Sequence, residues 1–142
     1  MVNITEETMM AGLSCGEVSK IAWQLLQNSL SHCVSITDDA VAPLMRLLKN
    51  GLDSTGPLEA GECSTSGVAT MLATKGNPEA LASLGLNSDS TVLLFGTEGA
   101  TSPEIYAKLT ETTEETSKSG LHIGVELGGT GCKIAVYREG EP

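Results

Sequence analysis

Apolar residues recur at the spacing of an α-helix in two segments of the first half of the chain. In residues 17–30, apolar positions three and four residues apart share one helical face. Residues 38–50 predict a second helix, because Asp38 is a favourable N-cap and Gly51 a favourable stop. The residues of its expected apolar face are Val41, Leu44, Met45, Leu47 and Leu48. Both segments therefore predict helices with one apolar face.

Shorter helices are predicted in the second half of the chain. Residues 63–74 combine small and apolar side chains, which lets a helix approach a sheet or a ligand closely. Proline suits the first turn of a helix, so Pro78 is expected to begin a helix that Gly85 ends. By the same argument Pro103 begins a helix that reaches about residue 116.

The pattern becomes continuously apolar in residues 91–95, Thr-Val-Leu-Leu-Phe. Such a run is typical of a central parallel strand that is covered on both faces. Residues 2–4 and 33–36 are shorter β-prone segments, and residues 122–127 and 132–137 predict two strands around a glycine-rich turn. The order of these elements predicts an α/β fold: an open, mostly parallel sheet with flanking helices, plus a C-terminal β-hairpin.

The chain is acidic, and its charge excludes some classes of partner. Its 142 residues carry 8 Lys and Arg against 18 Asp and Glu, a formal net charge of −10. This balance argues against nucleic-acid partners and against an anionic membrane surface. The sequence has no apolar run near the ~20 residues that a membrane-spanning helix needs, and its first ten residues lack the basic region of a secretory signal. A cytoplasmic location is therefore expected.

The cysteines and histidines do not predict a metal site. The two histidines lack metal-type spacing, and the cysteines form no Cys-X-X-Cys pair. We expect the cysteines to be reduced and mostly buried as small apolar side chains. They are Cys15, Cys33, Cys63 and Cys132.

Three glycine motifs occur in order along the first ~110 residues: Met-Met-Ala-Gly-Leu-Ser-Cys-Gly-Glu at 9–17, Ala-Gly-Glu-Cys-Ser-Thr-Ser-Gly at 60–67, and the segment 93–106 that begins Leu-Leu-Phe-Gly-Thr-Glu-Gly. Together they resemble the diaminopropionate ammonia-lyases. The resemblance implies a tryptophan-synthase-like fold and pyridoxal phosphate (PLP) as cofactor. It also implies elimination of both amino groups of 2,3-diaminopropionate, which yields pyruvate and ammonia.

The resemblance assigns a cofactor-binding role to each motif. The first motif would line one edge of PLP, the second would place a glutamate near the ring, and the third would offer a hydroxyl to the ring nitrogen. The residues implied are Ala11, Gly12, Leu13, Gly61, Glu62, Gly96 and Thr97. In the third motif, relatives tend to carry two acids and a serine that this chain lacks. The glycines are also consistent with simple turns, and Glu62 with an acid in the first turn of a helix.

The family's Schiff-base lysine, acid–base aspartates and phosphate loop precede the first of these motifs. None of the lysines of this chain lies in a motif of that type. We therefore assign no catalytic residue, and whether this chain is itself an enzyme stays open. We expect a fragment or truncated paralogue of a lyase that is inactive alone, either a homodimer or a chain that pairs with a missing N-terminal half. If completed, it would act on a small amino acid.

A second resemblance concerns residues 122–137, which are similar to the phosphate-binding hairpin that opens glucokinase-like sugar kinases. It implies that Gly128, Gly129 and Thr130 offer N–H groups and a hydroxyl to phosphates, and that Lys133 approaches one. An ordinary hairpin with a glycine turn explains the same residues.

The chain is therefore divided into a lyase-like part at 1–110, a linker at 111–120 and a kinase-like hairpin at 121–142. The alternatives to a lyase fragment are a nucleotide-phosphate-binding kinase-like fragment and a non-catalytic remnant that assembles with a partner half.

Overall fold

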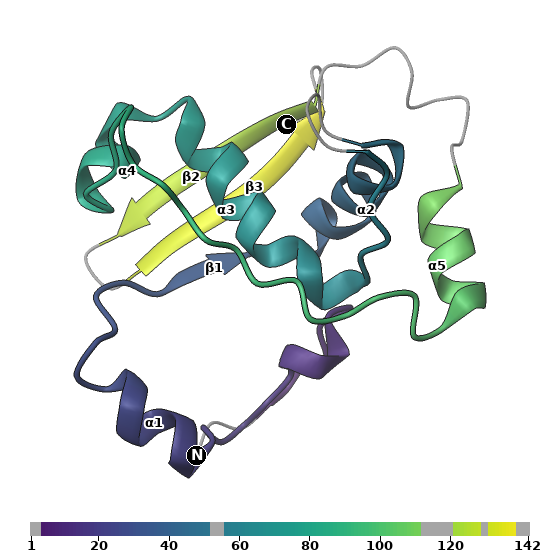
Figure 1. Ribbon diagram of the computed structural model, residues 1–142, viewed down its shortest axis with the longest axis horizontal. Coiled ribbons are helices and arrows are strands. Elements are labelled where there is room, and N and C mark those ends of the chain that lie inside the picture. The colour runs from purple at the N-terminus through teal and green to yellow at the C-terminus, as the bar shows by residue number, and fades with distance from the viewer. Residues whose placement is uncertain (1–3, 52–55, 112–120, 129–130, 139–142) are drawn as a thin grey trace.

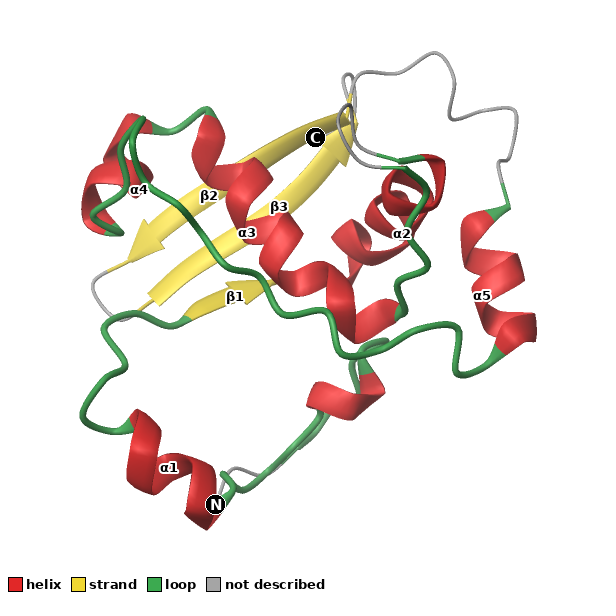
Figure 2. Cartoon of the chain, viewed as in Figure 1, coloured by secondary structure: helices red, strands yellow, loops and turns green. Residues whose placement is uncertain are grey.

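The computed structural model describes residues 4–51, 56–111, 121–128 and 131–138. Five α-helices, three 3-10 helices and three strands occur in this part of the chain (Figures 1 and 2). The 3-10 helices are η1 (Ala11–Leu13), η2 (Asp38–Ala40) and η3 (Glu62–Thr65). The α-helices are α1 (Lys20–Leu26), α2 (Val41–Asn50), α3 (Ser66–Lys75), α4 (Pro78–Ser83) and α5 (Pro103–Thr110). The strands are β1 (Val34–Ile36), β2 (Leu121–Gly128) and β3 (Gly131–Arg138).

The three strands form one sheet in the order β1–β3–β2. β1 pairs with β3 in parallel, with Ser35 opposite Lys133, and β2 pairs with β3 in the antiparallel direction, from Leu121↔Arg138 to Gly128↔Gly131. Helix α3 contacts all three strands and lies across the sheet, while α2 contacts α3 and α5 (Figure 1). The predicted α/β class is thus confirmed, but the sheet is mixed among the described residues.

The predicted hairpin is confirmed, since β2 and β3 pair along their whole length. Residues 129–130, which join them, lie outside the described residues, and so does most of the predicted linker at 111–120. The structure places β1 and β3 in one sheet. The division into a lyase-like part and a separate tail stays a prediction.

The core lies around α2. Met10, Val41 and Met45 form one buried cluster, against which Tyr106 and Leu109 of α5 pack. Leu44 joins a second buried cluster with two alanines, on the side of α2 that faces α3. Four of the five residues predicted for the apolar face of α2 are buried, and Leu47 is exposed, so that part of the prediction is wrong.

Helix ends follow the sequence signals closely. Gly51 ends α2 with φ 88° and Gly85 follows α4 with φ 68°, both in the left-handed region that favours glycine. Pro78 and Pro103 occupy the first positions of α4 and α5, as predicted. Helix α5 ends at Thr110, short of the predicted residue 116.

Two cations of α2 bind the end of α5. Arg46 Nη1 donates to the carbonyl of Leu109 at 2.8 Å, and Lys49 Nζ donates to the Thr110 hydroxyl at 2.9 Å. Lys49 also lies 5.7 Å from the centre of the Tyr106 ring. These contacts satisfy carbonyl and hydroxyl groups at the helix C-terminus and fix α5 on α2.

Asp38 does not cap the helix that it begins. Thr37 is the residue before η2, and no side-chain cap bond forms there. The Asp38 carboxylate instead accepts hydrogen bonds from the Thr8 hydroxyl and, at 2.6 Å, from the Met9 amide. The predicted capping role is therefore wrong, because the carboxylate anchors the segment before η1.

Residues 91–95 are not a strand, contrary to the prediction. A strand needs a neighbour for its backbone groups, and residues 91–97 form no backbone hydrogen bond with other described residues. The other predicted strand, residues 2–4, lies mostly outside the described residues, and Ile4 is irregular.

We expect Met45→Ala to lower the free energy of unfolding by about 2–5 kcal/mol, because Met45 is completely buried and truncation leaves a cavity. Urea denaturation followed by circular dichroism measures this loss. Leu25→Ala on the exposed face of α1 is the control and should change stability by less than about 0.5 kcal/mol. Equal losses in the two variants would contradict the placement of the core.

Candidate functional site

The three glycine motifs, far apart in sequence, meet in space. A Cβ built on Gly12 in η1 would lie 3.1 Å from the Cys63 sulfur in η3. Gly61, just before η3, donates its N–H to the carbonyl of Glu98 at 2.9 Å. A Cβ on Gly96 would lie 3.5 Å from the Cβ of Ser64. Residues from all three predicted cofactor motifs therefore surround the start of η3.

Glu98 forms most of the hydrogen bonds that join the third motif to the second. The Ser64 hydroxyl donates to the Glu98 carbonyl at 2.7 Å and accepts from the Glu98 N–H at 2.9 Å. The Glu98 carboxylate accepts from the Cys63 N–H at 2.7 Å. An N–H at the start of a helix lacks an intrahelical partner and favours an anion, so the carboxylate is well placed there. We call these bonds, with that from Gly61, the Glu98 latch.

Gly61 is required by the close approach of two backbones. A Cβ at this position would lie 2.6 Å from the Glu98 side chain and nearer still to the carbonyl oxygen of Gly99. Contacts that short force something to move, and here one of the atoms belongs to the backbone. The structure thus assigns Gly61 a packing role, which the sequence alone left undistinguished from a cofactor role.

A second acid supports the same loop from the other side. Glu59 Oε1 accepts from the Ala100 N–H at 3.1 Å, although Glu59 is exposed. The loop 98–100 is therefore held by two carboxylates and one serine. The sequence analysis did not single out Glu59, Ser64 or Glu98, because each acts through a tertiary contact at a separation of 34 or more residues.

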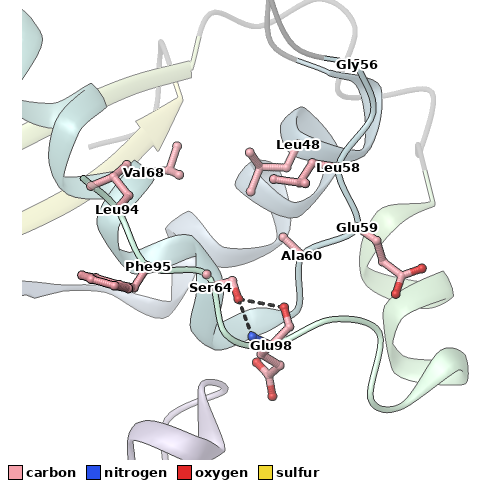
Figure 3. Close-up of a pocket in the computed structure, with 11 residues that line it drawn as sticks. Leu48, Gly56, Leu58, Glu59, Ala60, Ser64, Val68, Leu94, Phe95 and Glu98 are labelled. Carbon is pink, nitrogen blue, oxygen red and sulfur yellow. Dashed lines mark hydrogen bonds between the residues drawn. The ribbon is translucent and has the colours of Figure 1, made fainter. Parts of the chain in front are cut away.

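A cavity of about 320 Å³ lies beside the Glu98 latch (Figure 3). Leu48 and Leu58 face Val68 and Leu94 across it, whereas the carboxylate of Glu98 points away. Its lining residues are Leu48, Gly56, Leu58, Glu59, Ala60, Ser64, Val68, Leu94, Phe95, Gly96 and Glu98. The cavity is thus mainly apolar, and none of the described residues that line it is Lys, Arg or His.

The predicted cofactor residues occupy different environments. Gly96 lines the cavity, and the other predicted residues do not. Residues 11–13 and Thr97 are exposed, Glu62 is half-buried and Gly61 is buried. The Thr97 hydroxyl has no hydrogen-bond partner within the described part of the chain, so it is free to bind a ligand. Its role at a ring nitrogen stays a prediction.

These residues fit only one wall of a PLP site. A bound phosphate needs several N–H groups or a cation, and covalent attachment needs a lysine. Among the described residues no lysine lines the cavity, and Arg46 and Lys49 are engaged with α5. The residues described here therefore do not hold PLP on their own.

The Cys63 thiol has a raised pKa. Burial is the main cause, and a hydrogen bond with Glu98 adds to it, while the Gly12 backbone acts in the opposite direction. The thiol form thus dominates at neutral pH, which opposes a nucleophilic role. Cys15 and Cys33 are free and exposed, so the expectation that the cysteines are mostly buried is wrong for these two.

The described residues contain no cluster of His, Cys, Asp and Glu that could hold a metal ion. Within the same residues, no helix is long and apolar enough to cross a bilayer.

Comparison with curated proteins finds diaminopropionate ammonia-lyases. The protein of that name from Escherichia coli K12 is 32% identical over 105 residues, which cover 72% of this chain and 26% of the relative. The one from Salmonella typhimurium is 37% identical over 105 residues, 70% of this chain and 26% of the relative. Over this stretch the chain is a homologue of diaminopropionate ammonia-lyases. The predicted resemblance is confirmed.

The chain spans about a quarter of the length of the curated relatives that it matches. No protein-family model matches the chain, and no solved structure matches it significantly. The names of these relatives give no support to the sugar-kinase resemblance of residues 122–137, which stays a prediction.

We expect Gly61→Ala to destabilise the fold by about 1–3 kcal/mol, since the new methyl group overpacks the contact with Gly99 and Glu98. Gly76→Ala is the matched control, because a Cβ at Gly76 meets nothing within 4 Å. Thermal and urea unfolding of both variants measure the difference. A Gly61→Ala protein as stable as the control would show that the two segments do not approach closely.

We expect Cys63 to be alkylated severalfold more slowly than Cys15 and Cys33 near neutral pH, because its raised pKa leaves less thiolate. Iodoacetamide labelling followed by peptide mass spectrometry gives the three rates in one sample. Glu98→Gln should accelerate labelling of Cys63 and leave Cys15 unchanged, since the carboxylate contributes to the raised pKa. Equal rates at all three cysteines would contradict this environment.

Proposed function

We propose that residues 4–111 form one wall of the cofactor site of a diaminopropionate ammonia-lyase, within a tryptophan-synthase-like domain, and that this part is inactive alone. The observation that carries the proposal is the meeting of three separate glycine motifs around η3 in a homologue of these lyases. The motifs follow from the sequence and its resemblance to these lyases, so their convergence in space adds support of a different kind.

The overall reaction converts 2,3-diaminopropionate and water into pyruvate and two molecules of ammonia. Bound PLP would supply an electron sink for the carbanion formed when the α-proton leaves. The described residues would position the site: Glu98 and Ser64 hold the loop that carries Thr97, and the backbone at Gly12 lies against the Cys63 sulfur. A base for the α-proton and a lysine belong to the other walls of the site.

The proposal includes the sheet, the substrate class, the location and the assembly that a complete lyase domain would have. A complete domain of this kind would contain an open, mostly parallel sheet. Its substrate would be a small amino acid, its location the cytoplasm and its assembly a homodimer or a pairing with a further part of a lyase. The net charge of −10 is consistent with a small-molecule enzyme and opposes nucleic-acid binding.

We expect the purified chain to form no specific covalent adduct with PLP and to release no pyruvate from 2,3-diaminopropionate. The reason is that no lysine of the described chain lines the cavity next to the glycine motifs. Borohydride reduction followed by mass spectrometry detects a PLP–lysine adduct, and a coupled assay detects pyruvate. The full-length Escherichia coli relative is the positive control. A stoichiometric adduct on one lysine, together with pyruvate release, would contradict the proposal.

A further inference from the structure

Residues 92–95 have the side-chain alternation of a strand although they pair with no other strand in the described part of the chain. Val92 and Leu94 are each 40% exposed, whereas Leu93 and Phe95 are 76% and 77% exposed. One face is thus half-covered and the other is open, with the period of two that defines a β-strand. The covered face lies on α3, because a Cβ on Gly67 would meet the Leu94 side chain at 3.2 Å.

The backbone of the same segment is also open. Residues 91–97 share no backbone hydrogen bond with the other described residues, and the chain runs past α3 without joining the sheet (Figure 1). Unpaired N–H and C=O groups beside exposed apolar side chains form a ready template for another strand. At its C-terminal end the segment is fixed by the Glu98 latch, so this template is held in place.

The cavity extends this open surface. Leu94 and Phe95 belong to its lining, and Leu58 and Ala60 lie on its other side. An apolar cavity open to water stays unfavourable until apolar groups fill it. The exposed face of residues 92–95 and the cavity together form what we call the strand-docking surface.

We propose that the strand-docking surface binds, by β-strand addition, the remaining part of a lyase polypeptide: the portion of the curated relatives that this chain does not match. The inference rests on the proposed function, because that function defines the partner. The matched 105 residues cover only 26% of each relative, so most of a lyase polypeptide is available to supply strands. Backbone bonds at residues 92–95 give affinity, and apolar side chains in the cavity give register.

A second copy of this chain is a less suitable occupant. Each copy carries a net charge of −10, so two copies repel one another.

The probe is the Escherichia coli relative without its 105 matched residues, co-expressed with the full chain described here. We expect the two polypeptides to co-purify in equal amounts. We also expect amide hydrogen exchange at residues 92–95 to be fast in the free chain and slow in the complex. The same truncated relative co-expressed with its own excised segment is the positive control.

Leu93→Lys/Phe95→Lys tests the surface directly and should reduce the recovered complex at least about tenfold, because each lysine brings an unpaired charge to an apolar contact. Both residues are exposed, so circular dichroism of the free variant should not change. Ile21→Lys/Leu25→Lys on α1 is the matched control: these residues are 79% and 74% exposed and the charge change is identical. This control should leave the complex intact.

Three results would overturn the inference. The first is that no complex forms with this chain although the relative's own excised segment restores one. The second is that the two lysine pairs reduce the recovered complex equally. The third is slow amide hydrogen exchange at residues 92–95 in the free chain, whether it is monomeric or self-associated. Pyruvate production separates this inference from the proposed function. A complex that forms through residues 92–95 but makes no pyruvate, even with PLP, would retain the docking surface and count against the lyase function.

Discussion

The Glu98 latch is the interaction on which the rest of the described structure depends. It joins the start of η3 to a loop 34 residues later in the chain through bonds of 2.7–2.9 Å, one of them to a carboxylate. Net contributions of about 0.5–1.5 kcal/mol per neutral bond, and more for a charged one, make this a substantial share of a marginal stability. A Cβ at position 61 would overlap the Gly99 carbonyl oxygen and the Glu98 side chain, so the two backbones approach this closely because residue 61 is a glycine.

The Glu98 latch contributes this much to the stability because the apolar core is small. Half of the ten buried apolar residues are alanines, which bury little surface, while sixteen large apolar side chains of the described residues are exposed. Polar contacts compensate at three places: Glu98 on η3, Asp38 on the segment before η1, and Arg46 with Lys49 on the end of α5. Each of them connects segments distant in sequence.

The sequence predicted the features that depend on neighbouring residues only, such as the ends of helices. Gly51, Pro78 and Pro103 determine helix ends through backbone preferences, so these ends were predictable. The three glycine motifs in order predicted the homology, and residues from all three meet around η3. The predictions that were wrong concern residues whose role depends on contacts with segments distant in sequence. Asp38 has two competing uses, and only the folded chain shows that Thr8 and Met9 bind it.

Residues 91–95 show the same limit most clearly. Their composition is that of a central strand, and the alternating exposure of Val92 to Phe95 shows that the side chains already adopt that arrangement. A strand, however, forms only when a second segment pairs with it, and no described segment pairs with residues 91–95. The segment leads directly into Gly96 and Thr97, and Glu98 fixes its end. A strand added at 92–95 would therefore continue directly into the loop that carries the Thr97 hydroxyl, which Glu98 already holds against Ser64.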